Sequence, residues 1–151
     1  MIAIIGGTGL YDPKLLKDIE EVKVKTPYGK PADIVKGTID KKQVFLLARH
    51  GKNHGYNPSD VPYRANIWAL KELGVTKILS VSAVGSLKEE LMPGDIVFTD
   101  QFIDMTKKRE QTFYGTVHLS AAEPFCTNLR AKMINAAKAL KLRYHEKGTC
   151  V

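Results

Sequence analysis

The 151-residue sequence contains only two cysteines, and this scarcity narrows the class of protein. Cys126 and Cys150 are too few for a disulfide framework and lack the spacing of a zinc site. A disulfide-stapled secreted scaffold is therefore excluded, although the two thiols can still form one bridge. The cytoplasm is the expected compartment.

Long hydrophobic runs are also missing. No apolar run approaches the roughly 20 residues that span a bilayer. The first nine residues, MIAIIGGTG, are apolar but lack a basic leader and a small-residue cleavage site. They therefore predict a first strand rather than a signal peptide, and we expect no membrane partner.

Acidic residues are the minority among the charges. The sequence has 23 basic and 16 acidic residues and a net charge of +7, which favours anionic ligands. The lysines are scattered, however, and the longest basic run is Lys107 to Arg109. No aromatic-interleaved RNA motif accompanies them, so we interpret them as a solvated surface and expect no nucleic-acid partner.

The remaining composition is that of an ordinary globular protein, with 44% apolar and 26% charged residues. The length fits one domain over residues 1–151. The expected elements, in chain order, are a strand at 2–5, a helix at 13–21, a hairpin of 34–39 and 43–48, a helix from Pro62 to Gly74, strands at 75–83 and 96–98, a helix capped by Thr127, and a strand from Tyr144. In the helix after Thr127, one face carries Leu129, Met133, Ala137 and Leu140. This order predicts an α/β fold with a mixed β-sheet flanked by helices.

The segment VFLLARHG combines a predicted buried strand with candidate ligand-binding residues. Its apolar run, Val44 to Ala48, is typical of a buried strand. Arg49, His50 and Gly51 follow directly, and in open α/β sheets ligands lie beyond the carboxyl ends of the strands. Since arginine binds phosphate or carboxylate through a planar fork of donors, the segment indicates an anion site. A solvated surface arginine and histidine are the alternative.

Two other predicted strands end in similar groups. Thr8 lies in the turn Gly6-Gly7-Thr8-Gly9, whose backbone N–H groups can hold an oxyanion. Ser82 and Ala83 follow the strand at 75–83. The turn matches neither a dinucleotide-binding fingerprint nor a P-loop, and a plain tight turn remains an alternative. Parallel strands would bring these ends to one edge of the sheet.

No metal site is expected. His50 and His54 have the spacing of a helical metal pair, but the flanking glycines argue against a helix and no third ligand is near. No Ser/His/Asp or Cys/His nucleophile signature is visible, and we therefore assign no catalytic side chain.

A resemblance to a known family rests on motifs spread over essentially the whole chain. They are, in order, IIGGTGLYDP, TPYGKP, LLARHG, NPSDVPYRANIWALKELG, SAVGSL, PGDIVFTDQFID and AEPF. Together they resemble the trimeric purine nucleoside phosphorylases, and they are most similar to the branch acting on S-methyl-5′-thioadenosine.

The resemblance implies specific residue roles. Phosphate-binding positions would be Thr8, Arg49, His50, Ser82 and Ala83, and Ala83 would also lie near the sugar. Beyond these five, His118 matches the histidine that such trimers lend to the substrate pocket of a neighbouring subunit.

The implied reaction is phosphorolysis of S-methyl-5′-thioadenosine to adenine and 5-methylthioribose 1-phosphate. Inorganic phosphate would be a co-substrate, with no cofactor, and the assembly would be a homotrimer or hexamer. The family's ribose and purine contacts lie beyond Val151, so the resemblance implies that residues 1–151 are the N-terminal portion of a longer family domain, incomplete at the C-terminus. Alternatives are therefore a phosphorylase of inosine, guanosine or methylthioinosine, or a phosphate-binding fragment without activity.

Overall fold

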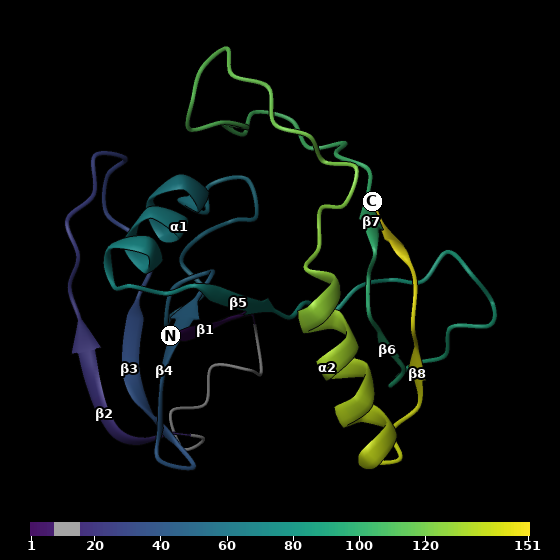
Figure 1. Cartoon of the computed structure of the whole chain (residues 1–151). Coiled ribbons are helices and arrows are strands. Elements are labelled where there is room, and N and C mark those ends of the chain that lie inside the picture. Colours follow the sequence, from purple (N-terminus) through teal and green to yellow (C-terminus); the bar gives the residue numbers. More distant parts are fainter. Residues whose placement is uncertain (8–15) are drawn as a thin grey trace. The chain divides into compact units, whose positions relative to one another are not determined.

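The computed structural model describes residues 1–7 and 16–151, and the chain divides into two compact units. The first unit comprises 1–84 and 108–113, and the second comprises 85–107 and 114–151. Each unit is built around its own strands and one helix (Figure 1). Among the described residues, no helix is long and apolar enough to cross a bilayer.

The first unit is organised by a five-stranded sheet in the order β2-β3-β4-β1-β5. Its strands are β1 (Ile2–Gly6), β2 (Lys17–Val22), β3 (Ile34–Ile39), β4 (Lys42–Ala48) and β5 (Lys77–Ser80). β1 runs parallel to β4 on one side and to β5 on the other, whereas β3 pairs antiparallel with β2 and β4. The prediction of a mixed sheet is therefore confirmed.

Alternating side chains of the central strands serve two different cores. Ala3, Phe45 and Leu47 contribute to one cluster, which also holds Ala69 and Leu70 of helix α1 (Tyr63–Glu72). The intervening side chains of β4 form a second cluster on the opposite face. This two-sided burial explains why β4 is a continuous apolar run, since each face of the strand must be apolar. Figure 1 shows α1 lying across the sheet near β3 and β4.

Helix α1 ends as the sequence predicts. Gly74 follows the last turn with φ of +74°, a conformation that glycine adopts without steric cost. Its N–H donates to the Lys71 carbonyl, and the Val75 N–H donates to the Leu70 carbonyl. These two bonds define a Schellman motif, which satisfies carbonyls that the helix leaves open.

The hairpin of β3 and β4 is confirmed, but the helix expected over 13–21 is wrong in its described part. Asp40 and Lys41 both have positive φ, as the tight turn that best matches strand twist requires. Lys17–Val22 forms the edge strand β2, with a register irregularity between Lys17 and Glu20. The irregularity disrupts the two-residue period of the strand, so its few apolar residues imitate helical spacing.

The second unit has little regular structure besides its helix. Its elements are β6 (Ile96–Val97), β7 (Gln101–Phe102), α2 (Thr127–Ala139), β8 (Tyr144–His145) and β9 (Thr149–Cys150). β6 pairs parallel with β8, and β7 pairs parallel with β9. The expected strand from Tyr144 therefore exists as two short strands. The strand expected at 75–83 is likewise shorter, because β5 ends at Ser80.

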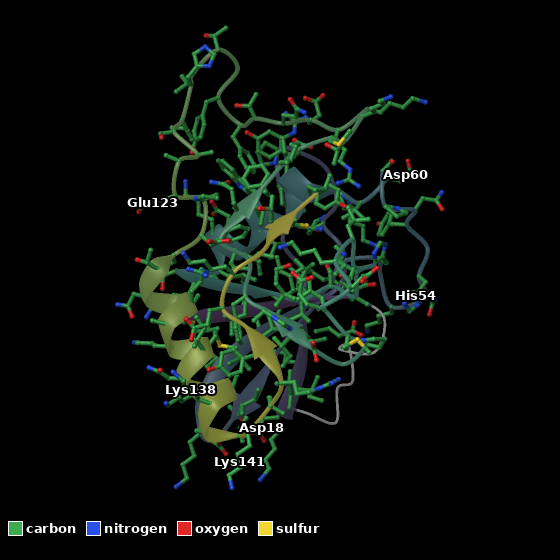
Figure 2. The ribbon with its side chains drawn as sticks, turned by 90° about the vertical axis from the view of Figure 1, so that its right-hand side faces the viewer. Asp18, His54, Asp60, Glu123, Lys138 and Lys141 are labelled. Atoms are coloured by element: carbon green, nitrogen blue, oxygen red, sulfur yellow. The ribbon has the colours of Figure 1, made fainter. Side chains whose placement is uncertain are left out.

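Two details of α2 differ from expectation. Thr127 is the first helical residue, and Cys126 holds the N-cap position without a side-chain hydrogen bond. Leu140 lies beyond the last helical residue and is 68% exposed, whereas Ala137 is buried. Figure 2 shows Lys138 and Lys141 near this end of the helix, pointing into solvent.

Candidate functional site

The carboxyl ends of β4 and β5 are held on either side of the end of β1. The Arg49 N–H donates to the Gly6 carbonyl over 3.0 Å, and the Val81 N–H donates to the Ile5 carbonyl over 3.0 Å. The parallel pairing with β1 thus continues for one residue beyond the end of β4 and of β5. As a result, Arg49 and Ser82 lie at the same edge of the sheet.

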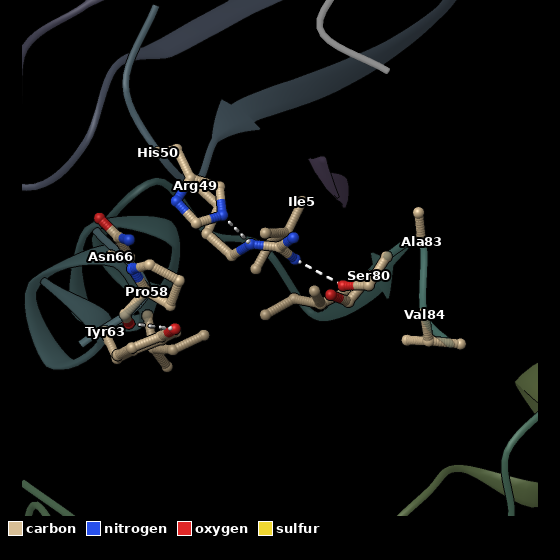
Figure 3. Close-up of a pocket in the computed structure, with 12 residues that line it drawn as sticks. Ile5, Arg49, His50, Pro58, Tyr63, Asn66, Ser80, Ala83 and Val84 are labelled. Atoms are coloured by element: carbon tan, nitrogen blue, oxygen red, sulfur yellow. Dashed lines mark hydrogen bonds between the residues drawn. The ribbon is translucent and has the colours of Figure 1, made fainter. Parts of the chain in front are cut away.

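Arg49 spans this edge through its guanidinium. Its Nη1 donates to the Ser82 Oγ over 2.8 Å, and its Nε donates to the His50 Nε2 over 3.2 Å (Figure 3). No described carboxylate forms an ion pair with Arg49. The edge therefore presents a half-buried cation whose charge is not neutralised by the described residues.

The hydrogen bonds of His50 define its tautomer. Its Nδ1 lies 2.9 Å from the Tyr56 carbonyl oxygen, which can only accept, so Nδ1 carries a proton. In the neutral ring Nε2 then accepts, which matches the donation from Arg49 Nε. His50 thus orients the guanidinium without adding a second positive charge.

Gly7 lets the guanidinium reach its place. A Cβ atom on Gly7 would lie 2.7 Å from the Arg49 Nη2, closer than real Cβ contacts. The absence of a side chain at Gly7 therefore allows the close approach of the guanidinium. The oxyanion-holding role that the sequence predicts for the turn falls partly on residues outside the described ones and stays a prediction.

Asp33 fixes the loop that carries these two residues. Its backbone carbonyl accepts the Ala48 N–H over 3.0 Å, and its Oδ2 accepts the Lys52 N–H over 2.9 Å. One residue at the start of β3 thus secures both ends of the segment that holds Arg49 and His50.

An open cleft of about 630 Å³ lies beside Arg49. Its lining residues are Ile5, Arg49, His50, Pro58, Tyr63, Asn66, Ile67, Ile78, Ser80, Ser82, Ala83 and Val84, all from the first unit. Figure 3 shows Arg49 between a wall with Asn66, Pro58 and Tyr63 and a wall with Ser80, Ala83 and Val84. The cleft combines a few polar donors with an apolar lining, as small-molecule sites commonly do.

A segment distant in sequence packs against the first of these walls. The Arg109 guanidinium carbon lies 4.8 Å above the Tyr63 ring centroid. Arg64 pairs with Glu110 over 3.5 Å and lies 4.9 Å above the Tyr28 ring. Residues 108–113 therefore contact the start of α1 and belong to the first unit.

The predicted site residues divide into three groups. Arg49, His50, Ser82 and Ala83 line the cleft together. Thr8 lies outside the described residues. His118 is exposed in the second unit, so its role toward a neighbouring subunit remains a prediction.

Sequence reasoning missed Asn66, Tyr63 and Pro58. Asn66 offered a signal, because it is a polar residue on the helix face that also carries Ala65, Ala69 and Leu70. Tyr63 and Pro58 gave no such signal, since proline is common in loops and an aromatic residue is commonly a packing residue. As for metals, no group of three or more His, Cys, Asp or Glu in residues 1–7 and 16–151 is placed to hold an ion.

Fold and site together define an α/β protein with a candidate anion cleft at the edge of a parallel strand triplet. The sequence model of the phosphorylase superfamily matches residues 1–151, and the chain therefore belongs to this family.

Individual relatives agree with the family. The chain is 55% identical over 154 residues to the S-methyl-5′-thioadenosine phosphorylase of Pyrococcus furiosus, covering 99% of this chain and 59% of the relative. It is 52% identical over 154 residues to that of Saccharolobus solfataricus, covering 99% and 57%. The structure of methylthioadenosine phosphorylase from Schistosoma mansoni in complex with adenine superposes with a TM-score of 0.92 at 42% identity, covering 98% of this chain and 62% of that one. The chain thus spans less than two thirds of these relatives.

Proposed function

We propose that this chain contributes the phosphate side of a nucleoside phosphorylase acting on S-methyl-5′-thioadenosine. The observation that carries the proposal is Arg49, a cation without a described carboxylate partner, held beside Ser82 in an open cleft. Support for the substrate comes from the relatives, whose names state this activity.

The cleft suits inorganic phosphate as co-substrate. Arg49, Ser82 and the backbone around Ala83 would hold phosphate oxygens, and Thr8 is assigned to the same group from the sequence. Each hydrogen bond to a charged group contributes roughly 1.5–3 kcal/mol. His50 would keep the guanidinium in the orientation that a phosphate dianion requires.

In the proposed reaction a phosphate oxygen bonds to the anomeric carbon of the sugar. The glycosidic bond breaks, and its electron pair leaves with the purine. Positive charge develops on the sugar, as in other glycosyl transfers, and the adjacent phosphate stabilises it. The side chains in the cleft therefore position phosphate rather than form a covalent intermediate.

Three further expectations belong to this proposal. The chain would work as a homotrimer or hexamer, in which His118 serves a neighbouring subunit. No cofactor would be required, and inorganic phosphate would be a co-substrate. The compartment would be the cytoplasm, in line with the two free cysteines.

The experiment is a product assay on the 151-residue chain with S-methyl-5′-thioadenosine, with and without phosphate. Any adenine that forms should require phosphate and appear together with 5-methylthioribose 1-phosphate, and Arg49→Ala should lower that activity about 100-fold. Adenine release without phosphate would identify a hydrolase and contradict the proposal. Phosphate binding without turnover would favour a binding fragment. Faster turnover of inosine or methylthioinosine would instead assign the purine differently.

A further inference from the structure

Asn66 is a buried polar side chain in the first turn of α1. It is only 3% exposed, and it is the only buried polar or charged residue of the described core. It also lines the cleft, on the wall with Pro58 and Tyr63 (Figure 3). Buried polar groups normally have hydrogen-bond partners, so the bonds of this amide decide its role.

One half of the amide has a defined partner. Asn66 Oδ1 accepts the Ala32 N–H over 2.7 Å. Because a backbone N–H can only donate, the oxygen of the amide must face Ala32 and the NH₂ group must face away from it. The hydrogen bond from the Ala32 N–H therefore defines the orientation of the Asn66 side-chain amide.

The other half has donors without a described acceptor. Asn66 Nδ2 donates no hydrogen bond to any described residue. Nδ2 is also not completely shielded from solvent. Since Asn66 is almost fully buried and the cleft is the opening that it lines, its small accessible part opens into the cleft.

We propose that Asn66 is a ligand-binding residue whose Nδ2–H donates to an oxygen acceptor of the molecule in this cleft. The inference rests on the proposed function, and it adds a donor on the wall opposite Ser80 and Ala83. The acceptor is an oxygen of the phosphate or a hydroxyl of the attached sugar. Apolar lining residues, Ile5 and Ile78 among them, would cover the uncharged part of the ligand.

Two variants separate ligand binding from the hydrogen bond between the Ala32 N–H and Asn66 Oδ1, which we call the clasp. Asn66→Asp retains an acceptor for the Ala32 N–H and removes both donors, whereas Asn66→Ala removes both functions. Ile67→Asp is the charge control, because it introduces a carboxylate at the neighbouring, 39% exposed lining position and leaves the clasp intact. Thermal melting reports the clasp independently of binding.

The probes are inorganic phosphate and ribose 1-phosphate, titrated calorimetrically into the 151-residue chain. We expect Asn66→Asp to weaken binding about 3- to 10-fold more than Ile67→Asp does, as loss of one hydrogen bond predicts. Equal weakening for both probes would assign a phosphate oxygen, and weakening for ribose 1-phosphate alone would assign a sugar hydroxyl. A second measurement needs no variant: the side-chain NH₂ resonances of Asn66 should shift on ligand addition in the unaltered protein.

Several outcomes would overturn the inference. If Asn66→Asp binds both probes as tightly as Ile67→Asp and the NH₂ resonances do not move, Asn66 only clasps Ala32. If phosphate still binds and Arg49→Ala abolishes that binding, the proposed function survives this failure. If the unaltered chain binds neither probe, both proposals fall.

Discussion

The two units of this chain differ in how much of their apolar surface they bury. In the first unit, α1 and both faces of the sheet enclose two clusters of buried side chains. In the second unit, Ala137 is the only described apolar residue that is buried, while Leu87 is 93% exposed and Leu119 is 72% exposed. Because apolar burial is the main favourable term in folding, stability should be concentrated in the first unit. The candidate cleft lies in that unit, at the ends of β4 and β5.

Truncating a core residue of the first unit should have the largest effect. Leu47 is completely buried, so Leu47→Ala should lower the free energy of unfolding by about 2–5 kcal/mol. Leu140→Ala, at a position that is 68% exposed, should change it by less than about 0.5 kcal/mol. Urea unfolding measures both, and equal losses would break the comparison between the units.

Gly7→Ala should damage the cleft more than the fold. The new methyl group would meet the Arg49 Nη2, the end of a flexible side chain, so the guanidinium moves and the sheet does not. We expect phosphate affinity to fall about 10-fold, as loss of one charge-assisted bond predicts, with little change in melting temperature. Gly55→Ala is the matched control, since its Cβ would have no neighbour within 4 Å. An unchanged affinity in Gly7→Ala would show that Arg49 is not held where the structure has it.

The ends of the two helices offer a smaller contrast. The position after the C-cap is Gly74 in α1 and Lys141 in α2, with φ of +74° and +54°. Lys141→Gly should therefore stabilise the second unit by about 0.5–1 kcal/mol, whereas Gly74→Ala should destabilise the first by about 1 kcal/mol. Lys138→Gly, inside α2, should destabilise by about 1 kcal/mol and serves as the control. Destabilisation by Lys141→Gly would contradict the left-handed cap.

The smallest expected effect is an acid sensitivity of the second unit. The His145 hydrogen bond, the Met92 N–H and Arg143 lower the pKa of Asp95 from its ordinary value. Since the folded pKa is depressed, this stabilisation is present above the unfolded pKa of about 3.9 and is lost as the pH falls through the folded value.

Hydrogen exchange tests this sensitivity. Protection of β6 and β8 should weaken below about pH 4 in the parent chain, and Asp95→Asn should lack that pH dependence. Glu123→Gln, at the exposed Glu123 (Figure 2), should retain it. An identical acid response in Asp95→Asn would assign the effect to other carboxylates.

The sequence predicted the strongly patterned parts of this fold. The apolar run of β4 and the end of α1 at Gly74 follow from burial and backbone conformation alone. β2 was mistaken for a helix, because an exposed edge strand with a register irregularity has no two-residue apolar period. The short strands of the second unit were only partly foreseen, since two-residue pairings depend on distant partners rather than on local sequence.

The candidate site was predictable where strand order determines it. β1 pairs parallel with β4 on one side and with β5 on the other, so all three strands end at the same edge of the sheet. Arg49 and Ser82, which follow β4 and β5, therefore lie close enough to form a hydrogen bond. The tautomer of His50, the clasp from Asn66 to Ala32 and the contact between Gly7 and Arg49 could not be predicted. Each joins residues far apart in sequence or depends on a side-chain orientation that only tertiary packing defines.

The central claim is that Arg49 holds an inorganic anion, and direct titration of phosphate into the 151-residue chain tests it. The matched variants are Arg49→Ala and Lys52→Ala, which each remove one positive charge. Lys52→Ala is the control, because Arg49 lines the cleft and Lys52 does not. The account predicts at least about a 10-fold loss of phosphate affinity in Arg49→Ala and less than about a 2-fold change in Lys52→Ala. Equal, small changes in both variants would show that phosphate responds only to net charge, and the anion site would be contradicted.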